Sequence, residues 1–102
     1  MSKFVKVALK KDIGEGKIKE FTLEEKTIAV ANTGGVYLAF DALCTHAHCS
    51  LAGGFLDGYT LTCYCHGAQF DVSNGEVLVP PASIPLGIYK VKVEGENILV
   101  EI

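Results

Sequence analysis

The sequence predicts an all-β domain, and three observations support this fold class. Short apolar or alternating runs, bounded by turn residues, recur along the chain, whereas helical periodicity is nearly absent. Eleven glycines and three prolines indicate many turns. The length of 102 residues corresponds to one small domain, near the lower limit of what a single hydrophobic core stabilises.

The predicted strands follow one another with short connections. We expect them at residues 4–9, 18–23, 27–31, 36–40, 59–63, 69–72, 77–79, 89–94 and 97–102. Residues 32–35 (Asn-Thr-Gly-Gly) and residues 95–96 (Gly-Glu) have the composition of hairpin turns. A further turn is expected at residues 56–58 (Leu-Asp-Gly). Residues 80–86 contain all three prolines and predict a stiff loop.

Charge is distributed unevenly along the chain. Residues 1–26 hold seven of the nine lysines and five acidic residues, whereas residues 27–89 hold four acidic residues and neither lysine nor arginine. The absence of a basic patch in the middle of the chain argues against nucleic-acid binding. A cation-free, mildly negative region suits docking onto a basic protein surface, although the four acids are equally compatible with an ordinary solvated face.

The sequence contains no apolar run of the roughly 18–20 residues that a membrane-spanning helix requires. Residues 1–12 also lack the apolar stretch and small-residue cleavage site of a secretory signal. We therefore expect a soluble protein with a cytoplasmic location.

All four cysteines and all three histidines lie within residues 44–49 (CTHAHC) and 63–67 (CYCHG). These runs fall on loops between predicted strands, where a rigid sheet can position a functional site. Each run offers a thiolate and an imidazole: Cys44-x-His46, then sixteen intervening residues, then Cys63-x-x-His66. A structural zinc site can use two cysteines and two histidines, but its usual spacing differs from this one.

The two motifs and their surroundings strongly resemble the Rieske iron–sulfur family. The resemblance covers essentially the whole chain, including VYLAFDALCTH, GGFLDGYTLTCYCHGAQFDVSNGEVL, the proline loop and the closing hairpin. It implies a Rieske-type fold, an antiparallel β-sandwich or incomplete barrel that forms a single domain over residues 1–102. Within this domain we expect a cluster-binding subdomain at about 41–82 and a base formed by residues 1–40 and 83–102.

The resemblance implies one Rieske-type [2Fe–2S] cluster per chain, with Cys44 and Cys63 on one iron and His46 and His66 on the other. Two ferric ions, two sulfides and two thiolates sum to zero, whereas four thiolates would leave the oxidised site at −2. Adding an electron to a neutral site costs less electrostatic work. Rieske potentials accordingly lie at about −150 to +300 mV, compared with about −400 mV for plant-type ferredoxins.

Cys49 and Cys65 are left outside this ligand set. In the respiratory branch of the family, cysteines at these positions form a disulfide, which ferredoxins serving aromatic-ring dioxygenases usually lack. The resemblance implies this bridge here, and it would close a loop of 17 residues (49 to 65 inclusive). On the chain-entropy model such a loop contributes about 3 kcal/mol. The alternative is a pair of buried thiols.

Two positions near the second motif depart from the respiratory pattern CPCHGSxY, whose serine and tyrosine hydroxyls hydrogen-bond the cluster sulfurs. Ala68 and Phe70 stand at these positions. With fewer hydrogen-bond donors to its sulfurs, the more negative, reduced cluster is less stabilised. We therefore expect a reduction potential below the respiratory range. We expect Phe70 to pack beneath the cluster and Tyr64, which replaces the proline, to face solvent.

Three further positions bear on the site. His48 replaces a glycine of the respiratory pattern and is expected to be exposed without a metal contact; the alternatives are a competing iron ligand or a titrating group near the cluster. Pro80 and Pro81 resemble the family's proline loop, which covers one side of the cluster. Gly53, Gly54 and Gly67 are expected to permit close backbone approach to the cluster or bulges beside it.

The resulting prediction is a one-electron carrier without catalytic residues or a small-molecule substrate. Its expected partners are redox proteins: a reductase, and an oxygenase or another terminal acceptor. One alternative is a high-potential respiratory-type Rieske protein or the Rieske small subunit of a larger oxidoreductase. A structural zinc-binding module is the other.

Overall fold

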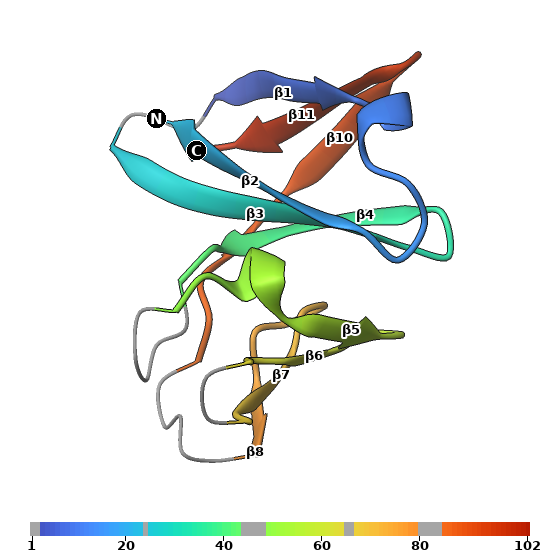
Figure 1. The fold of residues 1–102 in the computed structure, drawn as a ribbon. Helices are drawn as coiled ribbons and strands as arrows, with labels where there is room; N and C mark the ends of the chain where they lie inside the picture. The colour runs from blue at the N-terminus through green and yellow to red at the C-terminus, as the bar shows by residue number, and fades with distance from the viewer. Residues whose placement is uncertain (1–2, 24, 44–48, 65–66, 80–84) are drawn as a thin grey trace.

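The computed structural model describes residues 3–23, 25–43, 49–64, 67–79 and 85–102. Within these residues, eleven strands form three antiparallel sheets, which we call upper, middle and lower after their places in Figure 1. The upper sheet has the order β1 (Phe4–Leu9), β11 (Asn97–Glu101) and β10 (Val91–Glu94). The middle sheet has the order β2 (Ile18–Leu23), β3 (Lys26–Thr33), β4 (Val36–Asp41) and β9 (Ile88–Tyr89). The lower sheet has the order β5 (Phe55–Asp57), β6 (Thr60–Thr62), β7 (Gln69–Asp71) and β8 (Val77–Val79).

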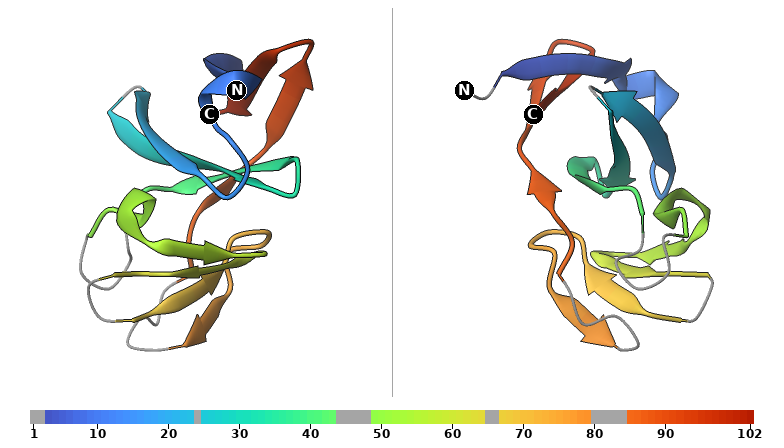
Figure 2. Two further views of the ribbon diagram at one scale, coloured as in Figure 1. Left: turned by 45° about the vertical axis from the view of Figure 1, so that its right-hand side comes forward. Right: turned by 90° about the vertical axis from the view of Figure 1, so that its left-hand side faces the viewer.

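The expected fold class is confirmed: open antiparallel sheets pack face to face. Both termini lie at the upper sheet, at the opposite end of the molecule from the lower sheet (Figure 2). The helical segments in the described part of the chain are two 3-10 turns, η1 (Lys10–Asp12) and η2 (Leu51–Gly53). Neither is long or apolar enough to cross a membrane.

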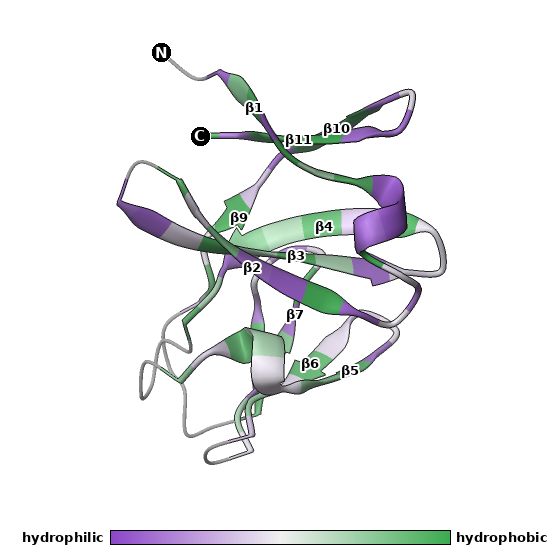
Figure 3. Ribbon diagram, turned by 45° about the horizontal axis from the view of Figure 1, so that its top comes forward, coloured by the Kyte–Doolittle hydropathy of each residue, from purple (hydrophilic) through white to green (hydrophobic). Residues whose placement is uncertain are grey.

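The central residues of β3 are buried on both faces of the middle sheet, which explains why this strand is almost continuously apolar in sequence. Successive side chains of a strand point to opposite faces. Ile28 and Val30 therefore pack in the core beneath the upper sheet, whereas Ala29 and Ala31 pack in the core above the lower sheet. Figure 3 shows hydrophobic residues along β4 and the hydrophilic turn η1 at the surface.

The lower core lies between the middle and lower sheets and contains one of the four predicted metal ligands. Its fully buried side chains include Phe40 from the middle sheet and Leu61 and Phe70 from the lower sheet. Cys63 belongs to the same cluster of buried residues. This core therefore joins the predicted metal motif to the rest of the protein.

Both predicted hairpin turns are confirmed. Thr33 pairs with Val36 across Gly34 and Gly35, whose φ angles of 60° and 88° give the two left-handed positions of a type I′ turn. In the second hairpin, Gly95 has φ of 60° at the first turn position, as a type II′ turn requires. Glycine accepts these conformations without a steric penalty, so both turns follow from local sequence.

Two predictions about strands were wrong. Residues 56–57 were expected in a turn, but they belong to β5, which pairs with β6, and the turn itself is at residues 58–59. A three-residue strand is too short to show a clear alternation. The expected single strand 89–94 is divided at Lys90: β9 pairs with β4 in the middle sheet, and β10 pairs with β11 in the upper sheet.

Candidate metal centre

The second motif begins at the end of β6. The amide of Cys63 donates a hydrogen bond to the carbonyl of Ala68 (2.7 Å), and the Gly67 amide donates to the Cys63 carbonyl (3.1 Å). Gly67 has φ of 76°, a conformation that favours glycine. These hydrogen bonds hold the two ends of segment 63–68 together beside the lower sheet, where Cys63 is only 1% exposed.

The segment that carries the first motif is closed in a similar way. Leu43 and Ser50 form an isolated antiparallel bridge, and the Leu51 amide donates to the Ala42 carbonyl (2.7 Å). The Ser50 hydroxyl donates to Oε1 of Glu20 on β2 (2.6 Å). The chain thus leaves and re-enters the fold at the edge of the middle sheet, and residues 44–48 lie between these anchored ends.

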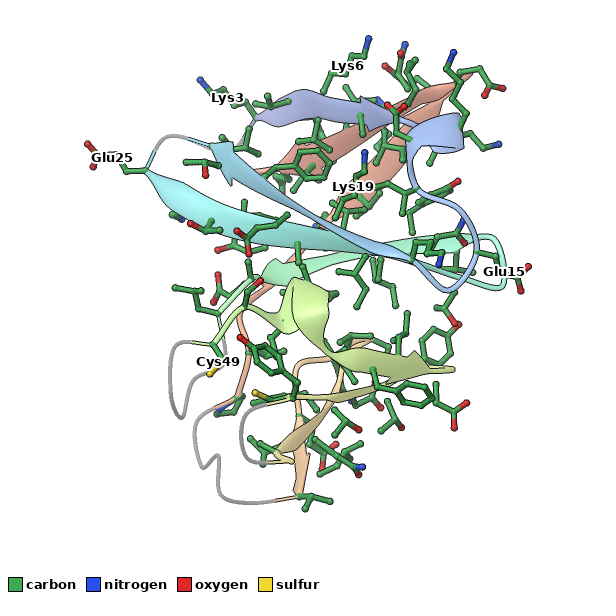
Figure 4. All side chains as sticks on the ribbon, in the orientation of Figure 1. Lys3, Lys6, Glu15, Lys19, Glu25 and Cys49 are labelled. Atoms are coloured by element: carbon green, nitrogen blue, oxygen red, sulfur yellow. The ribbon has the colours of Figure 1, made fainter. Side chains whose placement is uncertain are left out.

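The bases of the two loops are packed against each other. A β-carbon on Gly54, which follows η2, would lie 2.5 Å from the carbonyl oxygen of Thr62, the residue before Cys63. Gly54 therefore lies directly against the backbone of the strand that leads to Cys63. Leu51 is fully buried in the lower core, and Cys49 packs against that core (Figure 4). The fold consequently brings the bases of both motifs together around Cys63.

Two of the predicted site residues near the second motif are buried, and one is exposed. Ala68 and Phe70 are fully buried, and Phe70 packs in the lower core beside Cys63. Tyr64 is 63% exposed, as expected for a solvent-facing ring, and a β-carbon on Gly53 would lie 3.3 Å from the Tyr64 ring. Neither Ala68 nor Phe70 carries a side-chain hydroxyl.

Several predicted site residues lie outside the described part of the chain: Cys44, His46, His48, Cys65, His66, Pro80 and Pro81. Within the described part, no three histidine, cysteine or acidic side chains come together as a metal-binding group. Of the four predicted ligands, Cys63 is the one that lies in the described part of the chain. Its burial at the base of the two closed loops suits a thiolate ligand, and two cysteines with two histidines are the donor set of a Rieske centre.

The segment that follows the prolines is also anchored close to the site. Leu86 is 4% exposed, and its amide donates to the Gly75 carbonyl (2.9 Å). The next residue, Gly87, contacts Asp41 at the end of β4. Sequence reasoning missed Asp41 as a residue of this region. Its position three residues before the first motif was a signal, but its partner Gly87 lies 46 residues further along the chain.

One titratable group in this region is strongly perturbed. Burial, followed by the hydrogen bond to Asp41 and the negative charge of that carboxylate, raises the pKa of Tyr89 to about 12. The Tyr89 hydroxyl donates to Oδ1 of Asp41 (2.5 Å), which stabilises the neutral phenol.

Charge separates the two ends of the molecule. The labelled lysines Lys3, Lys6 and Lys19 lie at and next to the upper sheet, whereas Cys49 lies towards the lower sheet (Figure 4). Because residues 27–89 contain no lysine or arginine, neither residue type occurs in the lower sheet or in the two metal motifs.

Comparisons with known proteins agree with this geometry. Residues 3–96 match the Rieske [2Fe-2S] domain family. The ferredoxin component of the naphthalene 1,2-dioxygenase system of Pseudomonas aeruginosa is 34% identical over 91 residues, which cover 89% of this chain and 88% of that protein. The biphenyl 2,3-dioxygenase ferredoxin component of Rhodococcus jostii is 33% identical over 97 residues, with 95% and 91% coverage.

Solved structures show the same fold. The ferredoxin of carbazole 1,9a-dioxygenase from Nocardioides aromaticivorans superposes with a TM-score of 0.91 at 29% identity, covering 95% of each chain. A carbazole 1,9a-dioxygenase complex of reduced oxygenase and oxidised ferredoxin contains a chain that matches with a TM-score of 0.89 at 32% identity, covering 95% of this chain and 91% of that one.

The family match covers both metal motifs and therefore favours an iron–sulfur cluster over structural zinc. The chain belongs to the Rieske [2Fe-2S] domain family.

Proposed function

We propose that this protein is a single-domain carrier that relays one electron at a time from a reductase to an oxygenase or a similar terminal oxidoreductase. It is an electron-transfer component and not itself an enzyme, like the dioxygenase ferredoxins to which it is similar. The burial of Cys63 at the base of two closed loops is the structural observation that carries this proposal.

We assign the cluster ligands as Cys44 and Cys63 on one iron and His46 and His66 on the other. When bound, a Rieske-type cluster supplies a reversible one-electron couple. Cys63 is held in place by the hydrogen bonds of its own backbone, and Leu51, Ala68 and Phe70 exclude water around it. We place the cluster-binding subdomain at about residues 41–82 and the base at residues 1–40 and 83–102, a division supported by the separate lower sheet.

The partner is proposed to dock at the end of the molecule that carries the metal motifs. Four exposed apolar side chains lie on the segments that flank the loops of these motifs and of the prolines: Leu43 (38% exposed), Tyr64 (63%), Leu78 (45%) and Val79 (38%). Exposed apolar groups near a cluster permit close approach of a redox partner, and the absence of cations from residues 27–89 favours a partner with a basic rim. A complex between an oxygenase and a ferredoxin is known for carbazole 1,9a-dioxygenase, whose ferredoxin resembles this chain.

Anaerobic purification followed by chemical and spectroscopic analysis tests the function and the ligand set together. The expected result is about two irons and two acid-labile sulfides per chain, with a one-electron reduction and the EPR signal of a mixed cysteine–histidine site. His66→Cys should lower the midpoint potential if the cluster is retained, because a second thiolate on that iron adds negative charge. A colourless protein that contains zinc would refute the proposal.

A second candidate is a high-potential role, and two observations favour it. The cytochrome b6-f complex iron-sulfur subunit of Chlorobaculum thiosulfatiphilum is 35% identical over 89 residues, which cover 87% of this chain but 48% of that subunit. Cys49 and Cys65 also match the respiratory disulfide pair. Ala68 and Phe70 oppose this role because they offer no side-chain hydroxyls. A midpoint well above about +150 mV would favour the high-potential role.

We further propose that Cys49 and Cys65 form a disulfide that ties the two ligand loops together. In support, Cys49 packs against the lower core, where the bases of the two loops contact each other. Alkylation of the denatured protein without reductant, followed by mass spectrometry, should leave both residues unmodified. Modification of both would refute the bridge.

A cytoplasmic location is also proposed, and fractionation of the producing cells tests it.

A further inference from the structure

Asp41 joins two segments of the chain at the junction between the middle sheet and the metal motifs. It is the last residue of β4 and precedes Cys44 by three positions. Its amide donates to the Gly87 carbonyl (2.9 Å), and the Gly87 amide donates back to Oδ2 of Asp41 (3.1 Å). The Tyr89 hydroxyl donates to Oδ1 (2.5 Å). Both carboxylate oxygens are therefore used by the segment that follows the proline loop.

Gly87 packs closely against the carboxylate of Asp41. A β-carbon on Gly87 would overlap the Asp41 carboxylate. The φ angle of Gly87 is not in the left-handed region, so backbone conformation does not require glycine at this position. A side chain at position 87 would instead displace the Asp41 carboxylate from its contact with the Gly87 amide.

Tyr89 is itself held on two sides. Its backbone pairs with Ala39 of β4, and the ammonium group of Lys26 on β3 lies 5.7 Å from the centre of its ring. The ring therefore presents its hydroxyl to Asp41 from a fixed position. Because Leu86 is anchored to Gly75 of the lower core region, the whole return segment 86–89 is fixed relative to both sheets.

We propose that Asp41 is a positioning residue for the cluster: through Gly87 and Tyr89 it sets the spacing between the chain that enters the first ligand loop and the chain that leaves the proline loop. This inference rests on the proposed function, because it assumes that Cys44 is a ligand. Loss of the contact would let the two segments move apart. The immediate consequences would be altered cluster geometry and faster loss of the cluster, with the sheets still folded.

Four variants of the iron-loaded protein separate positioning from charge and from general stability. Asp41→Ala removes both carboxylate contacts, and Tyr89→Phe removes one. Asp41→Asn can keep both, because its amide oxygen accepts from Gly87 and its amide nitrogen donates to the Tyr89 hydroxyl. Tyr37→Phe is the matched control: Tyr37 also lies on β4, and its hydroxyl contacts Asn32 and the Lys10 carbonyl, away from the metal motifs.

The measurements are the rate of cluster loss to an iron chelator well below the unfolding temperature, the visible circular dichroism and EPR spectra, and the unfolding temperature of each variant. We expect Asp41→Ala and Tyr89→Phe to lose the cluster about tenfold faster, the usual scale for partners that orient metal ligands, and to show altered spectra. Asp41→Asn and Tyr37→Phe should match the wild type in the rate of cluster loss and in the spectra. Amide hydrogen exchange at Gly87 should also accelerate in Asp41→Ala.

Two outcomes would overturn the proposal. In the first, Asp41→Ala and Tyr89→Phe keep the wild-type spectra and rate of cluster loss. In the second, Asp41→Asn changes as much as Asp41→Ala while Tyr89→Phe does not, which would assign the effect to charge. A wild-type protein without iron and sulfide would instead refute the proposed function, so the two failures are distinguishable.

Discussion

Gly75 lies so close to Leu86 that a β-carbon on Gly75 would overlap the Leu86 carbonyl oxygen. The Gly75 carbonyl accepts the Leu86 amide hydrogen bond, so the two residues join the turn after β7 to the segment that follows the prolines. Gly75 also has φ of 82°. This contact helps to hold the return segment against the lower core.

The Gly75→Ala substitution should therefore destabilise the protein by more than a conformational penalty alone. A left-handed alanine costs about 1–2 kcal/mol, and displacement of the Leu86 backbone should raise the total to about 3 kcal/mol or more. Gly58→Ala is the matched control, because Gly58 has φ of 60° and a β-carbon there would have nothing within 4 Å. Urea unfolding of both variants measures the difference, and equal losses would contradict the expected clash.

The raised pKa of Tyr89 predicts a loss of stability at alkaline pH. The pKa is about 12 in the folded protein, compared with about 10 for an unfolded tyrosine. The stabilisation is therefore fully present below pH 10 and is lost as the pH rises from about 10 to 12, because the unfolded chain releases its proton first.

Absorbance at 295 nm and urea unfolding between pH 9 and 12 check this prediction. Tyr89→Phe should remove an ionisation step near pH 12 and flatten the loss of stability in that range, whereas Tyr37→Phe should retain the step. If the step persists in Tyr89→Phe, its assignment to Tyr89 is wrong.

A lysine placed on the proposed docking face should slow electron transfer to a basic partner. Leu78 on β8 is 45% exposed, and Val93 on β10 in the upper sheet is 42% exposed, so the two substitutions are matched in chemistry and exposure. At low salt we expect Leu78→Lys to reduce the second-order rate by about tenfold or more, because attraction to a basic rim is lost. Val93→Lys should leave the rate unchanged.

Stopped-flow reduction of a partner oxygenase at several ionic strengths provides the measurement. The effect of Leu78→Lys should shrink as salt screens the charges. Equal effects of the two lysines would place the docking surface elsewhere.

Restoring a hydroxyl beside the second motif should raise the reduction potential. Ala68 is fully buried next to Cys63 in the lower core, and a serine there could donate to a cluster sulfur. A hydrogen bond that favours the reduced state by about 1.4 kcal/mol corresponds to about 59 mV for a one-electron couple. We therefore expect an increase of several tens of millivolts for Ala68→Ser.

Ala8→Ser is the control, since Ala8 is a buried alanine in the core beneath the upper sheet. Voltammetry of both variants compares the potentials directly. A potential of Ala68→Ser that is equal to or below that of the wild type would contradict the expected hydrogen bond.

Most of the fold could be predicted where the controlling interactions are local. The turn at Gly34–Gly35 follows from backbone conformations that glycine favours, and the strands beside it alternate or run apolar as sheets require. β5 was missed because three residues carry too little pattern. The split at Lys90 was missed because the choice between two sheets depends on strands distant in sequence.

The candidate site divides in the same way. The spacing of the cysteines and histidines identified the family, and the structure shows that Cys63 is buried at the base of the two loops. The other three proposed ligands lie outside the described residues, so their roles stay predictions. Asp41 and Tyr89 were missed because neither residue belongs to the motifs.

The chain's residues by themselves determined the fold class, the hairpin turns and the type of metal centre, because each depends on neighbouring residues or on ligand spacing. Only the tertiary structure decided that β3 serves two cores and that Asp41 meets Tyr89, 48 positions away. The physical reason is that burial on both faces, and a hydrogen bond between distant segments, exist only after the sheets have stacked.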